Sequence, residues 1–399
     1  MMRLVSFFGL IFVILLAWLL SSDRKGMNVR LILSGTALQF LFAILILWTT
    51  PGQVVFEASR ALVAKILSFS DDGAQFVFGE NFREHFFAFS VLPTIIFVSS
   101  MTSVLFHLGI MQRVVKVIAK VMSRVMDTSG SESLVASANI FIGQTEAPLV
   151  IKPYLQTMTN SELMAMMTGG MATISAGMIA AYASMGLDAG HLLAASFMSA
   201  PASLVIAKIM FPESDISPTK GQVKIEVTKQ DSNLLDDACR GASEGVRLAL
   251  NIAGMLIAFI AIVSLLNWLM SFLPTAGNEP LTMQRLLGWI SAPFAWLLGV
   301  EWKDAQTVGF LLGEKIILNE FVAYLDLVKY KDLISPRSFS IATYALCGFA
   351  NFGSIAIQIG GISILAESRR KDFAKLGFKA MIGGALAAIM TATIAGMLI

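Results

Sequence analysis

Long apolar stretches separated by short polar connections recur along the whole chain, which is the pattern of helices that cross a membrane. A spanning helix needs about 20 mostly apolar residues. Eight stretches meet this condition and predict spanning helices at 4–20, 29–49, 87–108, 161–184, 187–211, 248–272, 338–364 and 376–399. The first stretch has no small-residue cleavage site after it, so we interpret it as a retained span and not as a signal peptide.

Three further stretches predict helices at the membrane surface. The segment 52–69 is amphipathic, and the segment 112–126 places basic residues three or four apart, on one helical face. These basic residues are Arg113, Lys116, Lys120 and Arg124. The segment 283–300 is apolar, and we interpret it as either a third surface helix or an extension toward the stretch that follows.

Two apolar stretches, 131–158 and 304–330, carry polar clusters near their centres. Gln144, Thr145 and Glu146 interrupt the first, whereas Asn319 and Glu320 interrupt the second. An ionisable side chain at membrane depth costs about 2.5–3.5 kcal/mol on insertion scales, so such residues are functional candidates. Each half of a stretch has about ten to twelve residues, or about 16 Å of helix, which is half a bilayer. We therefore expect two re-entrant hairpins.

The composition indicates an integral membrane protein, and the basic residues indicate its orientation in the membrane. Hydrophobic residues make up 56% of the chain and charged residues 14%, against about 25% charged in soluble domains. The net charge of +2 gives no indication of a nucleic-acid partner. The positive-inside rule places three basic connections in the cytoplasm, and with them the polar stretch 212–247. The first basic connection contains Arg24, Lys25 and Arg30, the second contains Arg113 to Arg124, and the third contains Arg369, Arg370, Lys371 and Lys375. Both termini then lie on the outer side.

Each predicted hairpin is followed by a glycine-interrupted span and then by a second span, so the chain holds two similar units. One hairpin opens from the cytoplasm and the other from outside, which makes the units inverted. Inverted repeats with broken helices near the bilayer midplane are typical of secondary transporters. We expect an all-α polytopic membrane protein with eight transmembrane helices, two re-entrant helical hairpins in an inverted repeat, and interfacial helices. The expected division is scaffold 1–110, first transport repeat 111–211, linker 212–247, scaffold span and surface segment 248–300, and second transport repeat 301–399.

The two hairpin clusters have the chemistry to bind a polar solute. Gln144 offers a donor and an acceptor and Glu146 offers an acceptor, a combination that can read the edge of a heterocyclic base. Glu320 can accept hydrogen bonds from two neighbouring hydroxyl groups, as in a ribose.

The seventh predicted span adds further polar candidates. Asn351 and Ser354 lie three residues apart on one helical face and can reach one ligand, although hydrogen bonding between helices explains them as well. Phe349 is either an apolar wall of that site or ordinary packing. Glu314, in the second hairpin, stays unassigned, as a buried carboxylate with its own proton chemistry or as a partner for Lys315.

Four motifs of the chain, in order, resemble the concentrative nucleoside transporters. They are GAQFVFG at 73–79, GQTEAPL at 143–149 with KPYL at 152–155, NEFVAY at 319–324, and GFANFGS at 348–354. The resemblance covers nearly the whole chain. It implies a homotrimer of eight-span protomers that bind a nucleoside between the hairpin tips and the broken helices.

The resemblance also implies roles for particular residues. Those that face the base are Gln144, Thr145 and Glu146, those that face the ribose are Glu320, Asn351 and Ser354, and Phe349 lines the pocket. The implied Na⁺ site consists of Asn139, Ile142, Thr173 and Ile174, through backbone carbonyls and two side-chain oxygens. A Thr-Glu-Ala-Pro tip is similar to that of the sodium-coupled members, whereas proton-coupled relatives depart there.

The expected function is import of nucleosides such as uridine by symport with Na⁺, through elevator-type movement, in a bacterial inner membrane. Proton coupling is the alternative within the family, and a channel for small polar solutes is the alternative of another class. An enzyme is disfavoured, because His85, His107 and His191 form no cluster and Cys239 and Cys347 have no metal-ligand spacing. We expect no cofactor beyond the coupling ion, and nucleoside, Na⁺ and membrane lipid as partners.

Overall fold

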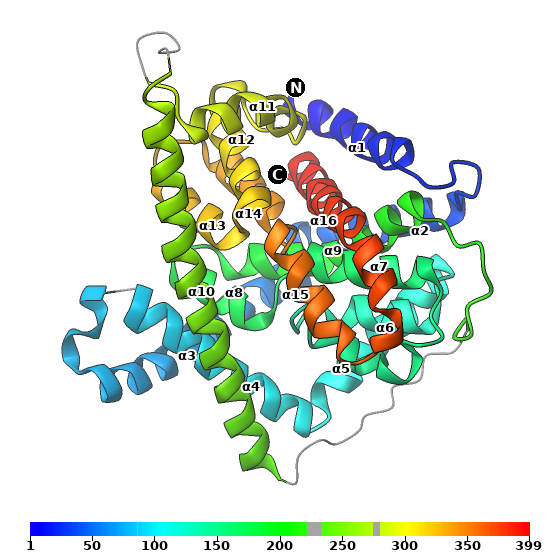
Figure 1. Cartoon of the computed structure of the whole chain (residues 1–399), viewed down its shortest axis with the longest axis horizontal. Coiled ribbons are helices and arrows are strands. Elements are labelled where there is room, and N and C mark those ends of the chain that lie inside the picture. Colours follow the sequence, from blue (N-terminus) through cyan, green and yellow to red (C-terminus); the bar gives the residue numbers. More distant parts are fainter. Residues whose placement is uncertain (86, 222–232, 274–279) are drawn as a thin grey trace.

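The computed structural model describes residues 1–85, 87–221, 233–273 and 280–399, and it is built from helices (Figure 1). Part of the predicted linker, 222–232, lies outside the described residues. In chain order the helices and helical turns are α1 (Met2–Leu19), α2 (Val29–Trp48), α3 (Thr50–Phe78), η1 (Glu80–His85), η2 (Phe87–Val91), α4 (Leu92–His107), α5 (Ile110–Met126), α6 (Gly130–Ala138), η3 (Ala147–Tyr154), α7 (Asn160–Ala172), α8 (Ala176–Ser184), α9 (Ala189–Met210), α10 (Leu234–Met270), α11 (Met283–Leu297), α12 (Trp302–Ile317), α13 (Glu320–Lys329), α14 (Pro336–Leu346), α15 (Phe352–Ser363), η4 (Glu367–Arg369) and α16 (Arg370–Leu398).

Among the described residues, seven helical stretches are long and apolar enough to cross a membrane, and they correspond to seven of the eight predicted spans. The eighth, predicted at 338–364, is divided by a break into α14 and α15. Burial separates the seven into two groups. The most apolar windows of α7 with α8 and of α9 are each 89% buried, whereas that of α10 is only 17% buried. Helices α7, α8 and α9 therefore form the centre of the molecule, and α10 lies at its periphery.

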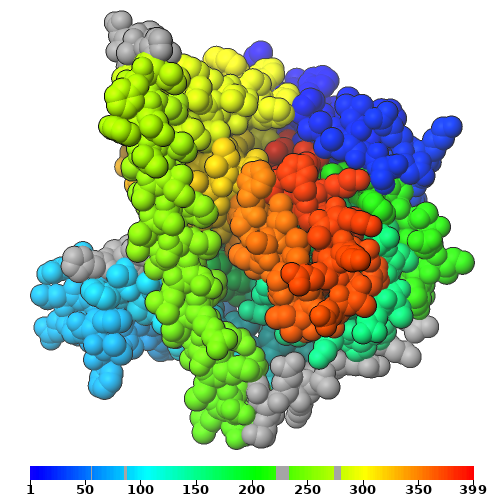
Figure 2. All heavy atoms as spheres, in the orientation of Figure 1, coloured from blue at the N-terminus to red at the C-terminus, as the bar shows by residue number. Residues whose placement is uncertain are grey.

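Helices α4 and α10 form a closely packed pair. Helix α10 begins at Leu234, well before the predicted start at 248, and runs along one flank of the molecule (Figures 1 and 2). A Cβ on Gly241 would lie 2.6 Å from the Ser103 Oγ, and one on Gly245 would lie 2.6 Å from the Ile96 Cα. Glycine at these positions lets the two helix backbones approach, as is common between membrane helices.

Helices α1 and α2 pack on the opposite part of the structure, α1 against α16 and α2 against α9. The Ser6 hydroxyl of α1 donates a hydrogen bond to the Leu298 carbonyl at 2.9 Å. A Cβ on Gly9 would lie 2.0 Å from the Leu297 carbonyl oxygen, so the α1 backbone lies directly against the end of α11. The first two spans are thus joined to α9, α11 and α16 by close packing.

The surface helices agree with the amphipathic patterns. Helix α5 buries Met111, Val115, Ala119, Met122 and Met126 on the face opposite its basic residues. Helix α3 extends to Phe78, further than the predicted end at 69. Helix α11 packs along α12, where a Cβ on Gly309 would lie 2.7 Å from the Ala292 nitrogen. Of the two interpretations of 283–300, the extension toward the second hairpin fits this packing.

The basic connections gather with the polar stretch that follows α9. The Ser22 amide donates to the Met210 carbonyl at 2.9 Å, and an Arg369 guanidinium nitrogen donates to the Met158 carbonyl at 2.7 Å. Ser129 forms an isolated antiparallel bridge with Lys220. Described parts of the segments predicted to be cytoplasmic are therefore held close to the ends of α7 and α9.

Candidate functional site

Four helix–break–helix elements supply the candidate site: the hairpins α6–η3 and α12–α13 and the interrupted spans α7–α8 and α14–α15. The breaks of the two interrupted spans meet at Gly348, which has a φ of +132°. A Cβ at Gly348 would lie 2.8 Å from the Met171 carbonyl oxygen. Only glycine combines this backbone conformation with so close an approach. The break of the second unit therefore rests directly on the break of the first.

Glu320 is the first residue of α13, and its carboxylate is held by two donors. One oxygen accepts from the Tyr182 hydroxyl of α8 and the other from the Asn351 side-chain amide, each at 3.1 Å. Asn351 is also the N-cap of α15, because its side-chain oxygen accepts from the Ser354 amide at 2.9 Å. Glu320 is 4% exposed and Asn351 5% exposed. The predicted ribose-facing residues are thus gathered in one buried cluster.

Gln144 connects the tip of the first hairpin to that cluster. Its Nε2 donates to the Ser354 hydroxyl at 3.1 Å, across two segments more than 200 residues apart in sequence. The next residue, Thr145, lies beside Gly361, where a Cβ would be 2.8 Å from the Thr145 Cγ2. Gln144 and Thr145, two of the base-facing candidates, therefore lie with the ribose-facing candidates between the hairpin tip, α13 and α15.

Glu146 has different surroundings from Gln144, because its side chain lines a cavity of about 410 Å³. The Gly143 amide donates to this carboxylate at 3.3 Å. Ser175, at the break before α8, also lines this cavity, as do Thr102 of α4 and Arg240 and Glu244 of α10 among others. The cavity therefore separates the first hairpin tip from the α4–α10 pair. Phe349 is half-buried and does not line this cavity.

The residues predicted to hold a cation come from two breaks, that of the first hairpin and that between α7 and α8. The two breaks are in contact, because the Ala176 amide donates to the Phe141 carbonyl at 2.9 Å. Both side-chain polar atoms of Asn139 are buried without a hydrogen-bond partner, which is rare enough to require an explanation. The carbonyls of Ile142, Thr173 and Ile174 accept no hydrogen bond from the described part of the chain. The Thr173 hydroxyl donates to the Gly169 carbonyl at 2.9 Å. Amide, hydroxyl and carbonyl oxygens are the ligands that hard cations prefer.

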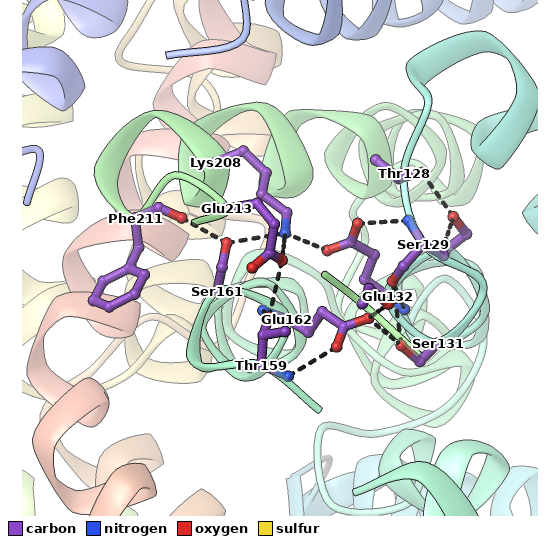
Figure 3. Close-up of polar contacts among 12 residues, drawn as sticks. Thr128, Ser129, Ser131, Glu132, Thr159, Ser161, Glu162, Lys208, Phe211 and Glu213 are labelled. Carbon is purple, nitrogen blue, oxygen red and sulfur yellow. Dashed lines mark hydrogen bonds and ion pairs between the residues drawn. The ribbon is translucent and has the colours of Figure 1, made fainter. Parts of the chain in front are cut away.

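A buried polar network, which the sequence patterns did not predict, anchors the base of the first hairpin (Figure 3). The Lys208 ammonium of α9 lies 2.7 Å from the Glu132 carboxylate of α6 and 3.1 Å from that of Glu213. Glu162 of α7 accepts from the Ser131 hydroxyl at 2.8 Å and from the Ser217 hydroxyl at 2.6 Å.

The sequence did contain a signal for part of this network. Ser129 with Glu132 and Thr159 with Glu162 are capping boxes, and the structure contains both. The N-termini of α6 and α7 are therefore fixed by the same carboxylates that join the network.

Glu314 and Lys315 point to different partners. The Lys315 ammonium donates to the Ala345 carbonyl at 3.0 Å. One Glu314 carboxylate oxygen is buried without a hydrogen-bond partner, and its charged neighbours are Asp326 and Lys329 of α13. Of the two interpretations of Glu314, the buried carboxylate fits this arrangement and pairing with Lys315 does not.

Two of the three histidines have partners that do not belong to the Glu320 cluster. His107 bonds to Asp237, and His191 bonds to the Tyr344 hydroxyl at 3.0 Å. The side chain of His85 lies outside the described ones. Within the described residues, no three His, Cys, Asp or Glu side chains could together hold a metal ion.

Spanning helices around two interrupted hairpins, with polar groups buried where the breaks meet, define a helical polytopic membrane transporter. Comparison with family models identifies which kind. The model of the Na⁺ dependent nucleoside transporter C-terminus matches residues 191–396, that of its N-terminus matches residues 8–81, and a nucleoside recognition model matches residues 88–188. The chain belongs to the Na⁺-dependent, or concentrative, nucleoside transporter family, as its motifs predicted.

Relatives and solved structures agree over the full chain. An uncharacterized transporter of Haemophilus influenzae is 43% identical over 99% of this chain and 98% of its own length. Solute carrier family 28 member 3 of Homo sapiens is 44% identical over 99% of this chain, which spans only 60% of that longer protein. The structure of CNTnw in an inward-facing substrate-bound state is 39% identical, with a TM-score of 0.93 and coverage of 100% and 98% of the two chains. A CNTnw variant in an outward-facing state has a TM-score of 0.94 at 39% identity, covering 100% and 98%.

Proposed function

We propose that this protein imports nucleosides across a bacterial inner membrane and is driven by Na⁺ that enters with them. The observation that carries the proposal is the buried cluster in which Gln144, Ser354, Asn351 and Glu320 join the two repeats. The first hairpin also holds the Asn139 amide, which has no hydrogen-bond partner among the described residues. Polar groups from two inverted units at one midplane site are the arrangement expected of a transporter that opens to alternate sides.

The roles proposed for the site residues follow their chemistry. Glu320 and Asn351 offer a carboxylate and an amide that can bond the two ribose hydroxyls. Ser354 adds a hydroxyl on the same side. Gln144 and Thr145, at the hairpin tip, face the base. Glu146 reaches the base from the cavity side, and Phe349 supplies an apolar wall.

The proposed Na⁺ ligands are Asn139, Ile142, Thr173 and Ile174. The fit is supported by the unbonded Asn139 oxygen and the three unbonded backbone carbonyls. A cation there would be the missing partner of these oxygens. It would thereby stabilise the hairpin-tip conformation that presents Gln144. That linkage is a coupling free energy between the Na⁺ and nucleoside sites. A membrane potential of 100 mV adds about 2.3 kcal/mol per charge to inward movement.

The proposed movement is elevator-like, with the α4–α10 pair and α3 as the static part. The hairpins with α7, α8, α9, α14, α15 and α16 form the moving part. The sequence-based division counted the first two spans as static, but their close packing on α9 and α16 favours placing α1 and α2 with the moving part. The cavity beside Glu146 lies at the boundary between the two parts. The family resemblance supports a homotrimer in which α4 and α10 face partner protomers.

Uptake into proteoliposomes tests the proposal. Radiolabelled uridine should accumulate above equilibrium when Na⁺ is higher outside, and it should not do so under a proton gradient alone. Accumulation driven only by the proton gradient would replace Na⁺ with H⁺ as the coupling ion. Flux that never saturates and never exceeds equilibrium would contradict a transporter and favour a channel.

A further inference from the structure

One face of α15 receives the tip of the first hairpin. Ser354, Gln358 and Gly361 are spaced four and three residues apart and therefore lie on this face. Ser354 accepts the hydrogen bond from Gln144, and Gly361 leaves room for Thr145. Gln358 lies between them and is 0% exposed. This amide, on an otherwise apolar stretch of helix, takes no part in the ligand roles assigned above.

Hydrogen bonds fix the orientation of the Gln358 amide. Its terminal group lies 3.0 Å from the Met167 carbonyl of α7. A carbonyl oxygen can only accept, so the Gln358 atom that faces it is the nitrogen Nε2. The same nitrogen lies 3.0 Å from the Gln144 side chain and donates its second hydrogen to the Gln144 Oε1. The Gln358 Oε1 has no hydrogen-bond partner among the described residues, so this side chain acts here as a donor.

The orientation of Gln358 in turn fixes that of Gln144. If the Gln144 amide turned over, two NH₂ groups would face each other, so its oxygen stays toward Gln358 and its nitrogen toward Ser354. Space for this contact depends on Gly170 of α7. A Cβ at Gly170 would lie 2.7 Å from the Gln358 Nε2 and 2.9 Å from the Gln144 Cβ.

We propose that Gln358 is a positioning residue that makes Gln144 present an N–H donor to the nucleobase, so that the transporter selects bases with an acceptor at that edge. The inference rests on the proposed nucleoside function. Gln144 has two N–H groups, of which Ser354 takes one, and the other stays available to a ligand. A pyrimidine carbonyl oxygen is the matching group. Gln358 itself does not touch the base.

Two substitutions separate positioning from simple packing. Gln358→Leu keeps similar bulk but removes both donors, and Gln358→Glu keeps the shape but loses the donors when ionised. Gln39→Leu is the matched control, because Gln39 is also a 0% exposed amide in a membrane helix, α2, and its contacts with Gly35 and Met390 lie outside the site. Each variant is reconstituted at saturating Na⁺, and KM is measured for four nucleosides.

The probes are uridine, the two pyrimidinone ribosides that each lack one base oxygen, and 3′-deoxyuridine, which lacks a ribose hydroxyl. Loss of one hydrogen bond is worth about tenfold in affinity. The wild type should therefore bind at least one pyrimidinone riboside about tenfold more weakly than uridine. In Gln358→Leu and Gln358→Glu that ratio should fall below about threefold, while the uridine to 3′-deoxyuridine ratio and the Gln39→Leu values stay unchanged.

Two results would overturn the inference while leaving nucleoside transport intact. One is a wild type that takes uridine and both pyrimidinone ribosides equally well. The other is a Gln358 variant that retains the wild-type base ratio or weakens all four nucleosides by the same factor. A wild type that transports no nucleoside at all would refute the proposed function itself, and the inference with it.

Discussion

At the scale of single residues, the most demanding group is the Glu320 carboxylate, because it is buried among uncharged donors. Its two oxygens accept from Tyr182 and Asn351 at 3.1 Å each. Hydrogen bonds to a charged group are stronger than neutral ones, about 1.5–3 kcal/mol each. A ligand hydroxyl that donates to Glu320, in place of one of these donors or in addition to them, therefore bonds the strongest acceptor in the cluster.

Glu320→Gln should weaken uridine binding by about tenfold or more, because an amide offers one acceptor oxygen where the carboxylate offers two. Equilibrium binding to purified protein measures this directly. The exposed Glu367→Gln is the control and should bind uridine as the wild type does. Unchanged affinity in Glu320→Gln would remove Glu320 from the ligand site.

The sequence predicted some of these residues and missed others for a physical reason. Gln144 and Glu320 are polar groups at points where an apolar stretch should be purest, so they were visible without any structure. Tyr182 was missed because an aromatic residue in an apolar helix normally packs, and only the fold brings its hydroxyl to Glu320. Gln358 did carry a signal, as an amide between Ile357 and Ile359, but its meaning depends on the Met167 carbonyl.

At the scale of elements, the base of the first hairpin depends on a buried ion pair. Lys208 is 6% exposed and Glu132 2% exposed. Removing one partner of such a pair leaves a charge in a poorly solvated place and costs about 3–5 kcal/mol, whereas removing both is far less costly.

Lys208→Met should therefore lower the thermal unfolding temperature sharply, and the double variant Lys208→Met with Glu132→Gln should recover most of that loss. Thermal denaturation in detergent, followed by tryptophan fluorescence, measures both. The opposite order, with the double variant less stable than the single one, would show that the ion pair does not dominate this network.

A second contact between elements joins α3 to the start of α9. The Arg60 guanidinium bonds the Asp188 carboxylate, which also caps α9 by accepting from the Gly190 amide at 2.9 Å. Burial alone would raise the pKa of Asp188, but the bonds from Arg60 and the His191 amide outweigh it and lower the pKa. The contact therefore stabilises the protein above the ordinary aspartate range, near pH 4, and is lost as the pH falls through the lowered pKa.

Arg60→Gln should destabilise the protein at pH 7, and the difference from the wild type should disappear as Asp188 becomes protonated. Thermal denaturation across a pH series measures this difference. Glu57→Gln is the control, because Glu57 pairs with the same arginine at 2.8 Å but is largely exposed. A difference that does not change with pH would assign the effect of Arg60 to packing on Phe56 instead.

At the scale of the whole molecule, the apolar pattern predicted the spans well because each one is set by local composition. The interruptions followed from polar and glycine positions in the same way. The grouping of helices did not follow, because it depends on which faces pack. Only the structure reveals that Gly9 of α1 lies against Leu297 and that Gly241 of α10 lies against Ser103.

The central claim is that a nucleoside and Na⁺ bind at adjoining sites where the two repeats meet, each raising the affinity for the other. Linkage requires that Na⁺ and uridine change each other's affinity by the same factor. The most direct measurement is uridine binding by calorimetry over a range of Na⁺ concentrations, in the wild type and in Asn139→Ala. We predict an affinity that rises with Na⁺ in the wild type and a much weaker dependence in the variant. A uridine affinity that is independent of Na⁺ in the wild type would contradict the account.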